Sequence, residues 1–170
     1  MTTKCDGLPW SKNLIRANLI TLVVAMIFGT YMLILISWIS LIIYWVFWLV
    51  FFTLGRYVSC RHCDFLGKPC PSWCMGIIGG KLFKRSQKDH IFEDKGMLKM
   101  AFFDIAPFAV AALLPIIFYI FNLFSVGLSF FDWILLIIYG IIVVVAFTLH
   151  QMGCNKCPIG QCPLSKSNKK

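Results

Sequence analysis

Charge is missing from two long parts of this sequence. From Ala17 to Gly55 the chain has no Asp, Glu, Lys, Arg or His, and from Ala101 to Leu149 its only charged residues are Asp104 and Asp132. These stretches exclude an ordinary soluble domain, in which charged residues recur every few positions. A hydrophobic fraction of 59% and a mean hydropathy of +0.81 agree with this exclusion. The sequence therefore predicts an all-α integral membrane protein.

Each uncharged stretch is too long for a single membrane helix, because a bilayer core of about 30 Å takes roughly 20 helical residues. A reversal is expected near Ser37 in the first stretch and near Gly127 in the second, where small and polar residues interrupt the apolar pattern. The result is a single membrane domain over residues 1–170, with four transmembrane helices arranged as two hairpins. These helices are expected at about 17–35, 40–56, 101–123 and 132–150.

Basic residues are absent from the two connections within the hairpins. All 16 Lys and Arg residues lie before the first helix, between the second and third helices, or after the fourth. The positive-inside rule places these three segments on the cytoplasmic face. We therefore expect a multi-pass protein of the inner cell membrane with both termini in the cytoplasm. The loop over 56–99 and the tail over 151–170 would then be cytoplasmic and rich in cysteine.

The eight cysteines all lie in these cytoplasmic segments, where disulfides rarely persist and clustered thiols more often bind metal or carry thiol chemistry. The first cluster reads CRHCDFLGKPCP from Cys60, and the second reads CNKCPIGQCP from Cys154. Each places a CxxC just beyond an apolar helix and then a Cys-Pro. This shared spacing predicts a parallel internal repeat of two hairpins, which would bring the two clusters together beneath the helices.

A CxxC turn can direct two sulfurs at one metal ion, and a tetrahedral zinc site uses two such pairs. The predicted metal ligands are Cys60, Cys63, Cys70, Cys74, Cys154, Cys157, Cys162 and His150. In one allocation each cluster holds its own ion, with His150 or Cys5 completing the second site. In the other, the two CxxC pairs share one ion. Zinc and an iron–sulfur cluster both remain open as the cofactor, although the C-x2-C-x2-C run of bacterial ferredoxins is absent.

These patterns predict a membrane protein whose cytoplasmic thiolate metal module serves binding, sensing or docking. One alternative is an iron–sulfur electron-transfer subunit of a membrane-associated oxidoreductase, and another is a CxxC thiol-redox membrane protein. No catalytic residue is identified, so we do not expect an enzyme that acts on its own. Asp104 is expected to line a shallow pocket with Lys99, or to reach the interface and cap a neighbouring helix.

The segment MGIIGGKLFKRSQK, which follows Cys74, interleaves apolar and basic residues. Such a segment can lie on the anionic inner leaflet, where each basic residue contributes about 1 kcal/mol of attraction. Membrane lipid is therefore an expected partner, and a cytoplasmic or membrane protein partner is a further one. Nucleic acid is not expected, because the positive-inside rule already accounts for the basic charge.

Overall fold

The computed structural model describes residues 10–63, 65–70, 72, 75–85, 101–125, 127 and 129–156. The predicted all-helical class is confirmed, since the described residues form helices and turns and contain no β-strand. The helices are α1 (Lys12–Ile36), α2 (Trp38–Val50), η1 (Phe51–Gly55), α3 (Arg56–Ser59), η2 (Cys60–His62), α4 (Met75–Leu82), η3 (Ala101–Ile105), α6 (Ala106–Ser125) and α7 (Phe130–Cys154).

Within the described residues, four helical segments are long and apolar enough to cross a membrane, as the sequence predicted. They are Lys12–Ile36, Trp38–Ser59, Phe102–Asn122 and Phe130–Cys154. The second is continuous through α2, η1 and α3, and the third joins η3 to α6. Two of these segments extend past the ends expected from the sequence. The second continues beyond 56 to Ser59, directly before Cys60, and the fourth continues beyond 150 to Cys154.

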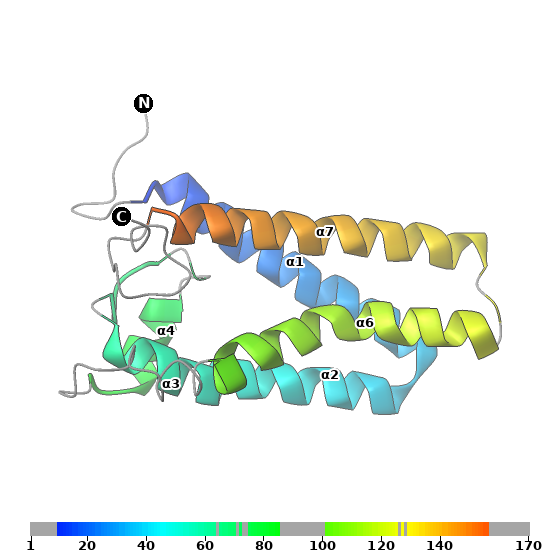
Figure 1. Ribbon diagram of the computed structural model, residues 1–170, viewed down its shortest axis with the longest axis horizontal. Coiled ribbons are helices and arrows are strands. Elements are labelled where there is room, and N and C mark those ends of the chain that lie inside the picture. Colours follow the sequence, from blue (N-terminus) through cyan, green and yellow to red (C-terminus); the bar gives the residue numbers. More distant parts are fainter. Residues whose placement is uncertain are drawn as a thin grey trace.

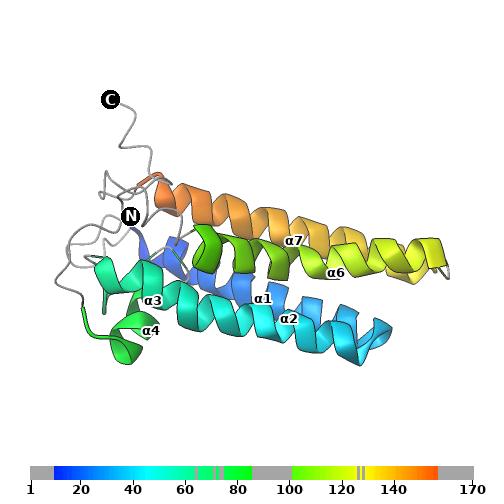
Figure 2. The ribbon, with the colours of Figure 1, turned by 60° about the horizontal axis from the view of Figure 1, so that its bottom comes forward.

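The four long helices lie side by side in an elongated bundle (Figures 1 and 2). α1 packs along α7, α2 packs along α6, and α1 also contacts both α2 and α6. The core contains large side chains such as Trp48, Tyr44 and Met32. Apolar side chains also cover the outside, where Trp38 is 70% exposed and Phe124 is 83% exposed. An outer surface of this kind suits contact with lipid better than contact with water.

Ser37 alone separates α1 from α2. Its backbone is extended, its N–H donates to the carbonyl of Leu33 at 2.9 Å, and its side chain accepts from the N–H of Ile39 at 3.2 Å. A single residue therefore closes one helix and caps the next. Between α6 and α7, Gly127 has a φ of +83°, a conformation that glycine adopts without steric cost. Ser129 and Asp132 then form a capping box at the start of α7.

Two π-helical turns, η1 and η3, pack against each other where the second and third apolar segments meet. Pro107 has no N–H to offer to the carbonyl of Phe103 four residues earlier, and the chain has π geometry at this point. Gly55 packs on the same carbonyl, since a Cβ added there would lie 2.6 Å from the Phe103 oxygen. This close approach brings the next residue, Arg56, beside Asp104.

Candidate functional site

The described cysteines gather at one end of the bundle. In Figures 1 and 2, α3, α4, the start of α1 and the end of α7 all lie at this end. We call it the cysteine end and define it as residues 56–63, 65–70, 75–82 and 150–154. It holds five of the predicted ligands: Cys60, Cys63, Cys70, Cys154 and His150. The other cysteines, namely Cys5, Cys74, Cys157 and Cys162, lie outside the described residues.

The first CxxC forms a tight turn directly after α3. Residues Cys60–His62 make one turn of 3₁₀ helix, and the N–H of Cys63 donates to the carbonyl of Cys60 at 3.0 Å. Cys63 itself is extended, with its thiol half-buried, whereas Cys60 is buried. The chain therefore leaves the helix between the two cysteines, which turns it back toward the segment that carries Cys70.

Three glycines allow α4 to lie directly on this turn. A Cβ added at Gly79 would lie 2.9 Å from the Cβ of Cys60, and one added at Gly76 would lie 2.4 Å from the carbonyl oxygen of Lys68. At Gly80, an added Cβ would lie 2.6 Å from the Cα of Gly67. Any larger residue at these positions would push α4 away from the cysteines. No role was expected for these glycines from the sequence, although their spacing on one short helix was a usable signal.

Cys70 is held at the start of α4. The backbone N–H of Gly76 donates to its sulfur at 3.3 Å, and its thiol donates to the carbonyl of Ser72 at 3.8 Å. Burial raises the pKa of Cys70 to about 11; the Gly76 hydrogen bond opposes the shift, and the neighbouring Cys60 thiol adds to it. Burial also raises the pKa of Cys60, against the opposing charge of Arg56. The two thiols therefore interact and are protonated at neutral pH when no ion is bound.

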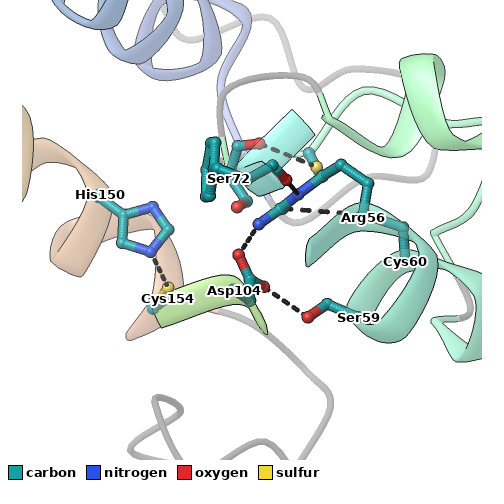
Figure 3. A network of polar contacts seen from close by, with 9 residues as sticks. Arg56, Ser59, Cys60, Ser72, Asp104, His150 and Cys154 are labelled. Atoms are coloured by element: carbon teal, nitrogen blue, oxygen red, sulfur yellow. Dashed lines mark hydrogen bonds and ion pairs between the residues drawn. The ribbon is translucent and has the colours of Figure 1, made fainter. Parts of the chain in front are cut away.

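Arg56 is the charged residue most deeply placed at the cysteine end, with a relative exposure of 2%. Each of its three guanidinium nitrogens faces a different group, as Figure 3 shows. Nη2 forms an ion pair with Asp104, Nε donates to the carbonyl of Phe51 at 3.3 Å, and Nη1 lies 3.9 Å from the sulfur of Cys60. The guanidinium also lies over the Phe51 ring, 4.3 Å from its centroid.

Asp104 pairs with Arg56 and also accepts a hydrogen bond from the hydroxyl of Ser59. This ion pair was not foreseen from the sequence. The expected pocket with Lys99 stays a prediction, as does the alternative of a place at the interface or a cap on a neighbouring helix. Lys99 lies outside the described residues. A carboxylate in an apolar helix needs a nearby cation to offset its desolvation, and Arg56 from the neighbouring segment provides it. The sequence held a signal for this ion pair, because Arg56 and Asp104 have opposite charges and lie at similar depth in two membrane-spanning segments.

The second predicted cluster begins within a helix. Because α7 continues to Cys154, His150 lies one turn before it on the same face, and its Nε2 is 3.4 Å from the Cys154 sulfur. α7 ends at Cys154, and the next residue, Asn155, keeps a right-handed helical conformation, whereas Cys63, which follows the turn of the first cluster, is extended. The structure brings this histidine and cysteine together, and Figure 3 shows the pair.

Trp10 connects the two cysteine regions and was not identified from the sequence. Its indole N–H donates to the carbonyl of Gly153, next to Cys154, at 3.0 Å. Its ring meets Phe65, between Cys63 and Cys70, edge-on with centroids 4.7 Å apart. Trp10 is 1% exposed. A single buried side chain therefore contacts the loop of the first cluster and the helix end of the second.

The described residues contain no group of three or more His, Cys, Asp or Glu side chains placed to hold a metal ion. They contain two pairs that could each supply part of a ligand set, namely Cys60 with Cys70 and His150 with Cys154. Neither a protein-family model, nor a curated protein, nor a solved structure matches this chain. The function is therefore argued from the chemistry of the cysteine end.

Proposed function

We propose that this protein anchors a thiolate metal module at the cytoplasmic face of the inner cell membrane, where the module serves binding, sensing or docking. The observation that carries the proposal is the packing of Cys60 and Cys70 beneath α4, with the Gly76 N–H directed at the Cys70 sulfur. Backbone N–H groups directed at sulfur support metal-bound thiolates in the same way as other outer-shell donors. Cys63, which ends the turn that begins at Cys60, and Cys74 would complete an all-thiolate set.

Zinc and an iron–sulfur cluster are both compatible with thiolates at this spacing. An iron–sulfur cluster would make the protein an electron-transfer subunit of a membrane-associated oxidoreductase, which is the second candidate. A CxxC thiol-redox protein is less well supported. Reactive thiols of that class are accessible and have a lowered pKa. Cys60 is instead buried, and its pKa is raised by that burial.

The two-hairpin repeat remains part of this proposal. It is supported by the nitrogen-bearing side chain found four residues before the first cysteine of each cluster, Arg56 in one and His150 in the other. A structure of the metal-bound protein should superpose α1 and α2 on α6 and α7, with the two CxxC turns facing one another. A second CxxC directed away from the first would exclude the shared cap.

The cytoplasmic orientation and the lipid contact rest on charge. α4 and the residues after it expose Lys81, Leu82 and Lys84, a mixed basic and apolar surface suited to anionic headgroups. A cytoplasmic or membrane protein could dock on the same end. In intact spheroplasts, a membrane-impermeant maleimide should label a cysteine introduced by Gly127→Cys and leave the native cysteines unlabelled. Labelling of Cys162 from outside would reverse the orientation.

Metal content is the direct test of the proposed function. Full-length protein purified without chelator and without oxygen should carry zinc or iron, and broad visible absorption would distinguish an iron–sulfur cluster from zinc. The double change Cys60→Ser with Cys63→Ser should remove at least one site per chain and make the loop sensitive to protease, because metal binding and loop order are coupled. Cys5→Ser is the control. A metal-free protein whose thiols all react in the native state would refute the module.

A further inference from the structure

Arg56 has more hydrogen-bonding partners than its ion pair with Asp104 requires. An arginine buried in a membrane-spanning segment is costly and usually marks a functional site. Asp104 uses one guanidinium nitrogen and the Phe51 carbonyl uses another, but the third faces the sulfur of Cys60. A lysine carries its three N–H donors on one compact nitrogen, so it could not span acceptors that lie around three separate guanidinium nitrogens. The arrangement of the guanidinium nitrogens therefore directs one donor toward the Cys60 thiol and another toward the Asp104 carboxylate.

The matching position of the second cluster shows what Arg56 cannot do. His150 lies four residues before Cys154 and can bind a metal through a ring nitrogen. Arg56 lies four residues before Cys60, but a guanidinium keeps its protons in proteins and has no lone pair to give. Its role toward a metal centre is therefore restricted to hydrogen bonding and charge.

We propose that Arg56 is the positioning residue of the first metal centre, donating an N–H to the Cys60 thiolate while Asp104, itself hydrogen-bonded by Ser59, holds its guanidinium in place. This inference rests on the proposed metal function. Four thiolates around one divalent ion carry a net negative charge, and hydrogen bonds from a cation to charged sulfur are stronger than neutral ones. The first centre is therefore suited to an all-thiolate ion or cluster, whereas the His150 and Cys154 pair suits a mixed nitrogen and sulfur set.

The test uses Co²⁺ as the probe, added to full-length protein in detergent, because sulfur-to-cobalt charge-transfer absorption reports thiolate binding. The double change Arg56→Gln with Asp104→Asn replaces the ion pair by neutral amides of similar size. It should weaken Co²⁺ binding by about 10- to 100-fold, the usual cost of losing an outer-shell partner. It should also move the charge-transfer band to longer wavelength, because the sulfur lone pairs lose a stabilising donor.

Two further variants make the result specific. Arg56→Lys keeps a positive charge opposite Asp104 and should still show the longer-wavelength band, so the proposal can be tested even if the double variant folds poorly. Arg61→Gln is the matched control. It removes a positive charge next to Cys60 in the sequence, but the Arg61 guanidinium lies over the Tyr57 ring, 5.0 Å from its centroid. Its affinity and spectrum should match those of the unchanged protein.

The outcomes separate the two proposals. If the unchanged protein binds Co²⁺ through thiolates and the folded Arg56 variants have the same affinity and the same band, Arg56 only balances Asp104 and the inference is wrong. If the unchanged protein gives no thiolate–cobalt absorption, the proposed metal function fails first and the inference falls with it. Weaker binding with a shifted band in the Arg56 variants, but not in Arg61→Gln, supports both.

Discussion

The two helix ends that lead into the CxxC sequences share a spacing but differ in chemistry. At the end of α3, the Arg56 Nη1 lies 3.9 Å from the Cys60 sulfur, and at the end of α7 the His150 Nε2 lies 3.4 Å from the Cys154 sulfur. One partner is a permanent cation, and the other is a potential ligand. The same spacing between a nitrogen-bearing side chain and a cysteine therefore places two different kinds of partner beside the sulfur.

The two ends also differ in how they are held in the protein. Arg56 needs a carboxylate from the third apolar segment, so the first cluster is tied to η3 through Asp104. The Cys154 end is tied to α1 instead, because Asn18 donates to the carbonyl of Leu149 at 3.1 Å and Trp10 donates to that of Gly153. The first tie depends on buried charge and the second on neutral hydrogen bonds. Changes to the first should therefore have the larger effects.

The largest expected effect comes from leaving one charge of the first cluster unpaired. Arg56→Met should lower the free energy of unfolding by about 3–5 kcal/mol, because Asp104 would remain buried without a cation. His150→Leu, at the matching position, should cost only about 1 kcal/mol, the usual contribution of a neutral hydrogen bond. Unfolding of the detergent-solubilised protein measures both.

A charge-free pair is the control for that experiment. Arg56→Met combined with Asp104→Leu should recover most of the lost stability, because no buried charge then remains unpaired. If the double variant were as unstable as Arg56→Met alone, packing of the long side chain would explain the loss. The difference in stability between the Arg56 and His150 variants would then reflect the size of the side chain and not the buried charge.

The number of membrane-crossing helices could be predicted from the sequence, because the length of an uncharged run directly limits how many helices it can hold. The end of the second segment was harder to place. Arg56 looked like the first loop residue because charge usually marks a helix end in a membrane. In the structure the helix continues to Ser59, because Asp104, far away in the sequence, neutralises Arg56 within the bundle. Only the packing of two helices makes that arrangement favourable.

The candidate site could be predicted only in part, because its packing also depends on residues that are distant in sequence. Cysteine spacing identified Cys60 and Cys70 as belonging to one cluster. It could not show that α4 covers both, because the covering depends on three glycines that have no chemistry of their own. Trp10 was also missed, since its partners Phe65 and Gly153 are distant in sequence and neither is a recognisable binding residue. The spacing of the cysteines is visible in the sequence, whereas the residues that pack around them follow from tertiary packing.

Thiol reactivity tests whether the first cluster is as enclosed as its packing indicates. Burial raises the pKa of Cys70 from 9.0 to about 11, so at pH 8 its thiolate fraction should be about 100-fold lower than in unfolded protein. Alkylation of metal-free protein by iodoacetamide, mapped by mass spectrometry, measures this ratio.

The raised pKa of Cys70 also means that the folded state holds the thiol proton more tightly than the unfolded state does. Stability should therefore be constant below about pH 9 and decrease between about 9 and 11.

One result would contradict the predicted slow alkylation of Cys70. Equal alkylation rates in folded and unfolded protein at pH 8 would show that α4 does not cover the thiol. The packing of α4 over the first cluster would then be absent. Denatured protein at the same pH is the control, because it removes burial and leaves the intrinsic reactivity of the same thiol.

Glycine substitutions give the next effect in size. Gly79→Ala places a Cβ 2.9 Å from that of Cys60, so α4 must shift, and overpacking of this kind costs about 1–3 kcal/mol. Gly140→Ala in α7 is the matched control, because no atom outside its own stretch of helix lies within 4 Å of the added Cβ. Unfolding of both variants and protease cleavage of the loop compare them. Equal stability would mean that α4 is not seated on the first cluster.

The smallest effect tests whether the two ends act as one unit. Trp10→Phe keeps an aromatic ring against Phe65 but removes the N–H that donates to Gly153, and it should cost about 1 kcal/mol. Trp38→Phe, at a position that is 70% exposed on the outer surface, is the control and should leave stability unchanged. Protection of the Cys154 amide from hydrogen exchange should fall in the first variant only. If the amide of Cys63 exchanges faster as well, Trp10 couples the two ends; if only Cys154 responds, they are separate sites that lie at the same end of the bundle.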